Sequence, residues 1–143
     1  MLAPLLALLA GASPPAVSPQ QAERDSDMSA GRICGVDARS NEKLAGELKS
    51  KPGTKILQDN GDFLQLVDLD RAVVWSFTVR KGPAYPAVSC SELGPLNGHL
   101  VFRQSVLCNG ASQTDCAAFF EMNRRRNATI AAGIEAQQAN ERQ

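Results

Sequence analysis

Apolar and polar residues alternate most clearly between residues 72 and 79. Val73, Trp75 and Phe77 fall on one side of an extended chain, and the residues between them fall on the other. A period of two predicts a strand with one buried and one wetter face, which is typical of an antiparallel sheet. The remaining predicted strands, the first of them brief, are 54–58, 63–69, 87–93 and 99–107.

Two segments carry helical signals instead. Residues 41–50 place Leu44 and Leu48 on one face, and the Pro52-Gly53 pair stops the helix. A second helix begins after a cap at Ser112 or Thr114. Its apolar face includes Phe119 and Phe120 and is interrupted between residues 123 and 127. These elements predict one short and one C-terminal helix.

The pattern as a whole predicts an α+β fold. We expect an antiparallel sheet of about four strands, packed on one face by the C-terminal helix, with the short N-terminal helix at an edge and two disulfides. The residues expected to share one core are Val73, Trp75, Phe77, Leu100, Phe102, Val106, Phe119 and Phe120.

The N-terminus predicts export. Nine of the first twelve residues are Leu or Ala, none is charged, and the run ends in Ala10-Gly11-Ala12, as a cleaved signal does. The run is too short for a stable membrane span, which needs about 20 apolar residues. The expected organisation is therefore a signal peptide at 1–12, a disordered leader at 13–32, a disulfide-bonded domain at 33–126 and a solvated helical or frayed tail at 127–143. We expect the mature chain to be periplasmic or secreted.

Export changes how the four cysteines are interpreted. In an oxidising compartment they form disulfides, and the chain has neither the CxxC pairs nor the clustered histidines of a zinc or thioredoxin-like site. A turn from strand end to helix start favours Cys108 with Cys116. Cys34 with Cys90 follows by elimination. We expect no metal and no cofactor.

Composition narrows the partners. The 15 basic and 15 acidic residues give no net charge, so no field points to nucleic acid. The run Arg124-Arg125-Arg126 fans over most of a helical turn and is interpreted as a solvated helix surface. The sequence leaves the oligomeric state open.

The chemistry-bearing residues are few. His99 is the single histidine, and Asp68 and Asp70 lie close together in sequence. Paired carboxylates can act as acid and base, so a small periplasmic hydrolase using Asp68, Asp70 or His99 is the alternative function. Turn chemistry and surface exposure explain the same residues without any catalysis.

The loop before residue 87 is the strongest binding candidate. Pro83 and Pro86 stiffen it, Tyr85 is the single tyrosine, and Cys90 follows in the next strand. A rigid loop that presents one aromatic side chain suits recognition of a partner. The competing interpretation is a crossover in which Tyr85 packs on the sheet edge.

One resemblance supports the same setting. The segment Trp75-x-Phe77-Thr78, then Pro83-Ala84-Tyr85-Pro86-Ala87, Cys90 and the Cys108–Cys116 spacing, is similar to small exported bacterial proteins of unassigned function over residues 72–120. The resemblance implies a bacterial envelope location and carries no activity. We therefore expect a non-enzymatic envelope protein that binds an envelope protein or cell-wall component.

Overall fold

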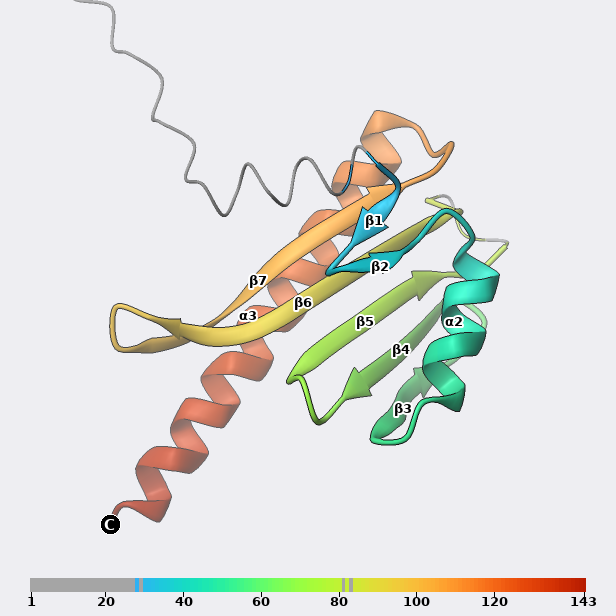
Figure 1. Ribbon diagram of the computed structural model, residues 1–143. Helices are drawn as coiled ribbons and strands as arrows, with labels where there is room; N and C mark the ends of the chain where they lie inside the picture. Colours follow the sequence, from blue (N-terminus) through green and yellow to red (C-terminus); the bar gives the residue numbers. More distant parts are fainter. Residues whose placement is uncertain (1–27, 29, 81, 83) are drawn as a thin grey trace, which may run out of the picture.

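The computed structural model describes residues 28, 30–80, 82 and 84–143 of the chain. Two antiparallel sheets and two helices make up the fold, which is α+β as predicted (Figure 1). The two-stranded sheet consists of β1 (Arg32–Ile33) and β2 (Val36–Asp37). The larger sheet has the order β3-β4-β5-β6-β7, and its five strands correspond to the five predicted strand segments. Its strands are β3 (Thr54–Asp59), β4 (Phe63–Asp68), β5 (Val73–Thr78), β6 (Ala87–Leu96) and β7 (His99–Cys108).

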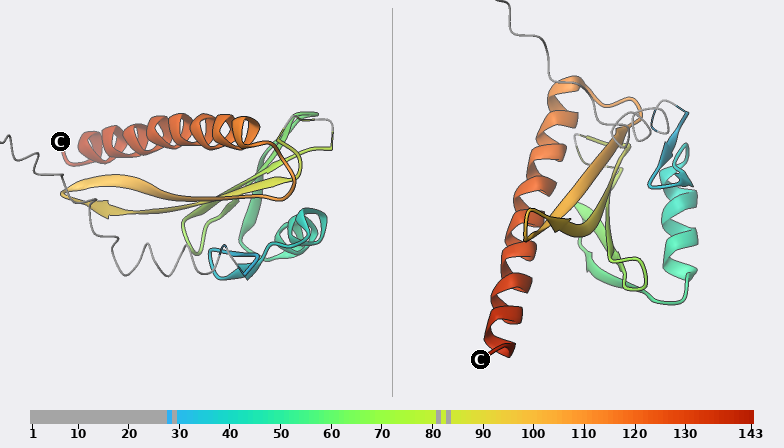
Figure 2. Two further views of the ribbon diagram at one scale, coloured as in Figure 1. Left: turned by 90° about the horizontal axis from the view of Figure 1, so that it is seen from above. Right: turned by 60° about the vertical axis from the view of Figure 1, so that its left-hand side comes forward.

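The two helices lie on opposite faces of the larger sheet. Helix α2 (Asn41–Ser50) and the β1–β2 pair cover one face, and α3 (Gln113–Glu141) covers the other (Figure 2). Leu44 and Leu48 of α2 are buried in the same apolar cluster as Trp75. The short helix contacts β3, the edge strand of the larger sheet, as expected, and its two leucines reach the apolar face beside it.

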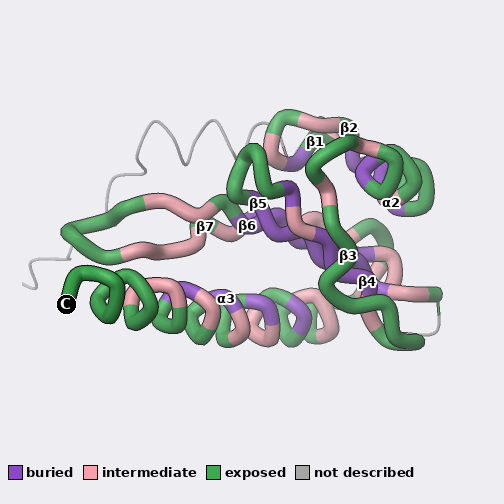
Figure 3. Tube along the Cα trace, turned by 90° about the horizontal axis from the view of Figure 1, so that it is seen from below, coloured by how far each residue is buried: buried purple, intermediate pink, exposed green. Residues whose placement is uncertain are grey.

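The larger core lies on the α2 face. Paired residues of an antiparallel sheet point to the same face, and Trp75 pairs with Leu66 and Cys90, all of them fully buried. Phe119 of α3 instead lies in a separate, smaller cluster with Ala84 and Ala87. The single expected core is thus two clusters, separated by the sheet itself. Burial is greatest in the central strands (Figure 3).

Several residues expected in the core are less buried than predicted. Phe120 is 40% exposed, and Leu100 and Phe102 are half-buried. The reason is the length of the β6–β7 hairpin, which extends beyond the other strands and is covered on one face by α3 (Figure 2).

That hairpin also runs further than its sequence indicates. Residues 94–98 resemble a turn, yet β6 continues to Leu96, and Asn97 and Gly98, both with positive φ, close a two-residue turn. Pro95 is tolerated in the strand because Leu96 and His99 form the hydrogen-bonded pair next to the turn, so the backbone nitrogen of residue 95 points away from β7. On its other side, residue 95 lies beyond the end of the pairing between β5 and β6. No ladder hydrogen bond is lost.

Helix α3 is one continuous element. Ser112 caps it by accepting a hydrogen bond from the Asp115 amide at 3.1 Å. Its buried residues, Phe119, Asn123, Asn127 and Ala131, repeat every four positions. The boundary expected at residue 126 falls inside the helix, because Asn123 and Asn127 continue the buried stripe from Phe119 to Ala131.

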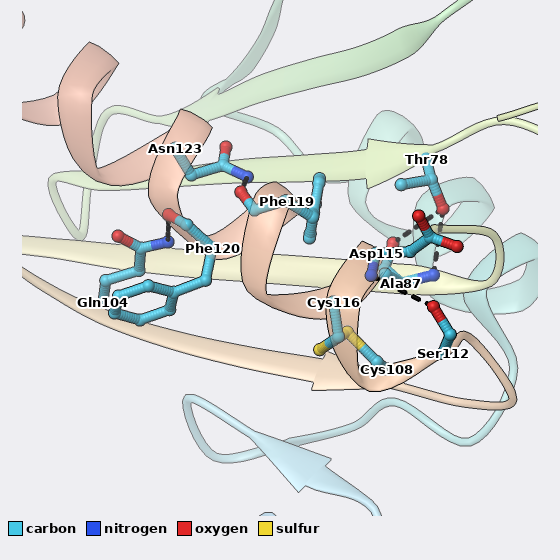
Figure 4. Close-up of a disulfide and its surroundings, with 10 residues drawn as sticks. All are labelled: Thr78, Ala87, Gln104, Cys108, Ser112, Asp115, Cys116, Phe119, Phe120 and Asn123. Atoms are coloured by element: carbon cyan, nitrogen blue, oxygen red, sulfur yellow. Dashed lines mark hydrogen bonds between the residues drawn. A yellow bond between two sulfur atoms is a disulfide. The ribbon is translucent and has the colours of Figure 1, made fainter. Parts of the chain in front are cut away.

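Two disulfides fix the layers, with the predicted pairing. Cys34–Cys90 joins the β1–β2 turn to β6, with Cα atoms 6.4 Å apart. Cys108–Cys116 joins the end of β7 to the first turn of α3, with Cα atoms 6.1 Å apart (Figure 4). Each layer is therefore tied covalently to the β6–β7 hairpin. Disulfides persist in oxidising compartments, so this framework indicates a protein that folds outside the cytoplasm.

The expected export elements lie largely outside the described residues. The signal peptide at 1–12 and the leader up to residue 27 belong to that part of the chain. Arg32 is already in β1, one residue before the expected start of the domain. None of the described helices is long and apolar enough to cross a membrane.

Candidate functional site

The loop that carries Tyr85 is packed against the body of the protein. Tyr85 and Pro86 are half-buried, Ala84 is buried, and the Tyr85–Pro86 peptide is cis. Pro83 is outside the described residues, so its predicted role stays a prediction. Because Tyr85 is half-buried, its side chain does not project freely into solvent. It forms one wall of a pocket instead.

This pocket, which we call the Tyr85 pocket, opens between α2 and the ends of β4 and β5. It has a volume of about 300 Å³. Its floor and walls are largely apolar, and the residues that form them are Ala45, Leu64, Phe77, Val79 and Tyr85. An apolar hollow with few polar groups is the usual form of a ligand site.

Asn41 is one of the polar residues in the lining of this pocket, with Glu42, Thr78 and Arg80. The residue is 8% exposed, and neither its Nδ2 nor its Oδ1 has a hydrogen-bond partner among the described residues. Ser40, not Asn41, caps α2, by accepting from the Lys43 amide. An unsatisfied buried amide costs about 1–3 kcal/mol. The fold therefore holds a donor and an acceptor side by side without a partner among the described residues, and both atoms are shielded from solvent.

An ion pair stands at the rim of the Tyr85 pocket. Arg80 donates to Glu42 with an Nη2–Oε1 distance of 2.6 Å, and both side chains are mostly exposed. The Glu42 carboxylate, with Tyr85 next to it, raises the pKa of Arg80 above its ordinary value. This pair joins α2 to the end of the sheet and leaves no uncompensated charge at the rim.

A second hollow lies on the other face of the sheet, beside the same loop. It has a volume of about 290 Å³, and Gly82 and Ala84 contribute to its wall. Phe63 and Phe119 stack there with ring centroids 6.3 Å apart. We call it the Phe119 pocket. It contains no buried side chain lacking a hydrogen-bond partner among the residues described, which distinguishes it from the Tyr85 pocket.

The carboxylates proposed for catalysis have structural surroundings. Asp68 is fully buried and accepts from Lys51 Nζ at 2.5 Å and from the amides of Asp70 and Arg71 at 3.2 Å. Lys51 above all, with these amides, lowers the pKa of Asp68. Asp70 is exposed in the turn after β4. Asp68 thus stabilises the turn after β4 and forms an ion pair with Lys51. The two carboxylates do not face each other across a cleft.

His99 lies far from both aspartates. It starts β7 at the tip of the hairpin, where Nδ1 is 3.6 Å from Glu135 of α3 and the side chain is 75% exposed. Asp68 pairs with Val73, Val73 with Glu92, and Glu92 with Arg103, so β7 is three strand spacings, about 14 Å, from Asp68. The structure does not bring the three candidate residues together.

The described residues contain one group of ligand atoms close enough to share a metal ion. It consists of Cys34, Cys90 and Glu92, and its two sulfur atoms are joined in a disulfide. A disulfide offers no thiolate, so this group is not a metal site.

Sequence reasoning found Tyr85 but missed Asn41. An asparagine at the start of a predicted helix, such as Asn41, is usually interpreted as its N-cap. In α2 the neighbouring Ser40 is the N-cap instead. A polar residue on the same face as two buried leucines, at i, i+3 and i+7, was the available signal.

Fold and site together define a disulfide-bonded α+β protein with a small, largely apolar pocket whose lining includes Asn41. Comparison of the chain with protein-family models, with curated proteins and with solved structures found no match in any of the three. The site therefore has to be interpreted from its own chemistry.

Proposed function

We propose that the chain is an exported, periplasmic or secreted binding protein of the bacterial envelope, without catalytic activity of its own. Its partner is an envelope protein or cell-wall component that inserts an apolar group bearing an amide into the Tyr85 pocket. The observation that carries the proposal is the Asn41 amide, which is buried, without a partner among the described residues, and part of the pocket lining.

The chemistry of Asn41 selects the ligand class. An asparagine side chain donates through Nδ2 and accepts through Oδ1. A group that satisfies both at once has an acceptor and a donor side by side, as a peptide bond or an N-acetyl group does. The surrounding Leu64 and Phe77 favour apolar atoms next to that amide. Both partner classes carry such groups.

Replacement of Asn41 separates binding from folding. Asn41→Leu has a similar volume and removes both unsatisfied polar atoms, so the variant is expected to unfold at the same or a higher temperature than the natural chain. Recovery of the partner, from an envelope extract or on purified cell-wall sacculi, is expected to fall about tenfold or more, the loss of roughly one well-formed hydrogen bond. Tyr85→Ala is expected to lower it as well.

Two exposed positions on α3 supply the matched controls. Asn140→Leu makes the same chemical change outside the pocket, and Phe120→Ala removes an aromatic side chain that is 40% exposed. Both are expected to retain full recovery. If Asn41→Leu is folded and recovers the partner as well as the natural chain does, the Tyr85 pocket is not the binding site.

A further inference from the structure

The interface between α3 and the sheet is unusually polar for a buried layer. Ser76, Ser89 and Ser91 are fully buried on the face that α3 covers, and Asn123 and Asn127 are buried on the helix. Asn127 donates to the Ser91 hydroxyl at 2.7 Å. The hydroxyls of Ser76 and Ser89 have no hydrogen-bond partner among the described residues. This layer therefore contains polar atoms that the described chain does not satisfy.

Arg126 adds a charge to this layer. Its three guanidinium nitrogens are shielded from solvent, and none has a hydrogen-bond partner among the described residues. Arg124 and Arg125, by contrast, both donate to Glu121 on the exposed side of the helix. Burial lowers the pKa of Arg126. The interpretation of all three arginines as a solvated surface was thus wrong for Arg126.

Packing places Arg126 over the central strands. Met122, one turn earlier, lines the Phe119 pocket with Phe63 of β4, whereas Arg124 lines a different hollow with Phe102 of β7. Arg126 therefore lies on the side of α3 that is nearer β5.

The two unpartnered hydroxyls lie at the same level. Ser76 and Ser89 form a cross-strand pair on β5 and β6. Ser89 lies two residues before Ser91, the partner of Asn127, and two residues of strand match about one turn of helix in length. The serine pair is thus level with the helical turn that ends at Arg126.

No carboxylate of the described chain forms a hydrogen bond or ion pair with Arg126, although Asp62 and Asp115 lie on this face, in the lining of the Phe119 pocket. Glu121 pairs with the two exposed arginines, and Glu135 accepts from the Leu100 amide at the far end of the helix. Glu92 pairs with Val73, so it points to the α2 face, as does Asp68. A buried charge without a partner is strongly unfavourable, and a bound anion would neutralise it.

We propose that a small oxyanion, such as a phosphate or a carboxylate, binds between α3 and the sheet. The guanidinium of Arg126 and the hydroxyls of Ser76 and Ser89 hold it there. The guanidinium supplies charge and a planar fork of donors, and the hydroxyls supply two more. The donors are shielded when α3 is docked, so the anion is enclosed as the helix packs onto the sheet. Anion binding and α3 docking are therefore coupled.

The test compares anions on the full, oxidised chain. Thermal unfolding is measured in chloride and in rising inorganic phosphate or acetate at constant ionic strength. At about tenfold its dissociation constant a single bound anion is expected to raise the unfolding temperature by about 5 °C. Phosphate also stabilises proteins without binding them, so the meaningful quantity is the difference from a variant without the guanidinium.

Arg126→Met supplies that variant, and Arg125→Met is its matched control on the exposed side. The Arg126→Met substitution is not expected to prevent folding, because it replaces an unpaired buried charge with an apolar side chain of similar length. The anion-dependent rise should vanish in Arg126→Met and persist in Arg125→Met. Equilibrium dialysis should give one phosphate or acetate per natural chain and none for Arg126→Met.

Two results would overturn the proposal. One is an equal anion-dependent rise in the natural chain and in Arg126→Met, which would be general salt stabilisation. The other is the absence of any rise or any bound anion in the natural chain, which would leave ordered water as the partner of these groups. Neither result touches the Tyr85 pocket, which lies on the opposite face.

Discussion

At the scale of single residues, Asp68 shows how a charge can be buried without becoming a catalytic group. Its carboxylate is 0% exposed, and the Lys51 ammonium and two turn amides all donate to it. The three donors join the end of α2 to the turn between β4 and β5. Asp68 is thus a local joint of the fold rather than an acid or base.

Asp68→Asn is expected to lower the free energy of unfolding at pH 7 by about 1–3 kcal/mol, because Lys51 loses its charged partner and the amides lose a strong acceptor. Urea unfolding measures this loss. Asp70→Asn, an exposed change two residues away, should have a much smaller effect. Equal losses in the two variants would contradict the joint described above.

Acid should weaken the same contact. Lys51 lowers the pKa of Asp68 in the folded chain below its unfolded value of about 3.9. The folded state therefore binds fewer protons there, so this contribution is complete above the unfolded pKa and is lost as the pH falls through the lowered folded value. Between about pH 5 and pH 2, the natural chain should lose more stability than Asp68→Asn in urea titrations. Parallel losses would show that Asp68 does not titrate as described.

At the scale of elements, α2 and the turn after it contain two glycines with opposite roles. Gly46 is exposed in the middle of the helix, and a Cβ there would meet nothing within 4 Å. Gly53, after the helix, has φ of +84°, and a Cβ there would lie 2.5 Å from Asp70 Oδ2. The first glycine weakens the helix, and the second one permits the turn into β3.

Alanine at these two positions should therefore shift stability in opposite directions. Gly46→Ala is expected to add about 0.5–1 kcal/mol, because it restricts the unfolded chain and favours the helix. Gly53→Ala is expected to cost more than that, because an L-residue is strained at positive φ and meets Asp70. Chemical denaturation of both variants checks the signs. A neutral Gly53→Ala would argue against the turn as described.

The elements also show what the sequence can predict and what it cannot. Helix α2 is predicted over its observed range, because the two leucines and Pro52-Gly53 agree locally. Trp75 was expected to pack under the C-terminal helix, but it packs under α2. An alternation of apolar and polar residues distinguishes the two faces of a strand but does not show which element covers each face. Asn123 and Asn127 were missed because polar residues in a helix indicate solvent, unless a polar sheet face such as Ser89 and Ser91 lies opposite.

The Tyr85 pocket is predictable only in part. Tyr85 is found because a lone aromatic residue between prolines is visible in the sequence. Asn41 is harder to find, because its place beside two predicted core leucines is a weak signal and the pocket walls come from residues distant in the chain. A residue whose polar atoms are left unpaired becomes visible only when its surroundings are known.

At the scale of the whole molecule, the two disulfides differ in how much chain they enclose. Cys34–Cys90 spans 56 residues, and Cys108–Cys116 spans 8. The first one attaches the β1–β2 layer to the sheet, and the second one attaches α3. A longer loop loses more conformational freedom in the unfolded chain when it is closed.

Removal of the long-range disulfide should accordingly be the more damaging change. By loop-closure entropy, replacing Cys34 and Cys90 with serine is expected to cost about 4 kcal/mol, and replacing Cys108 and Cys116 about 2.5 kcal/mol. Urea unfolding of the two double variants measures the difference. A reversed order would show that the loops are not the main origin of the stabilisation.

The short disulfide has a consequence for the mobility of α3. Its tether to β7 makes the encounter of helix and sheet an intramolecular event, with an effective concentration in the millimolar range, ~1 mM or more. A contact surface too polar to hold two separate chains together can then stay closed most of the time. If α3 detaches from the sheet, the disulfide keeps it close to its docking site. The apolar layer under α2 keeps the rest of the molecule folded.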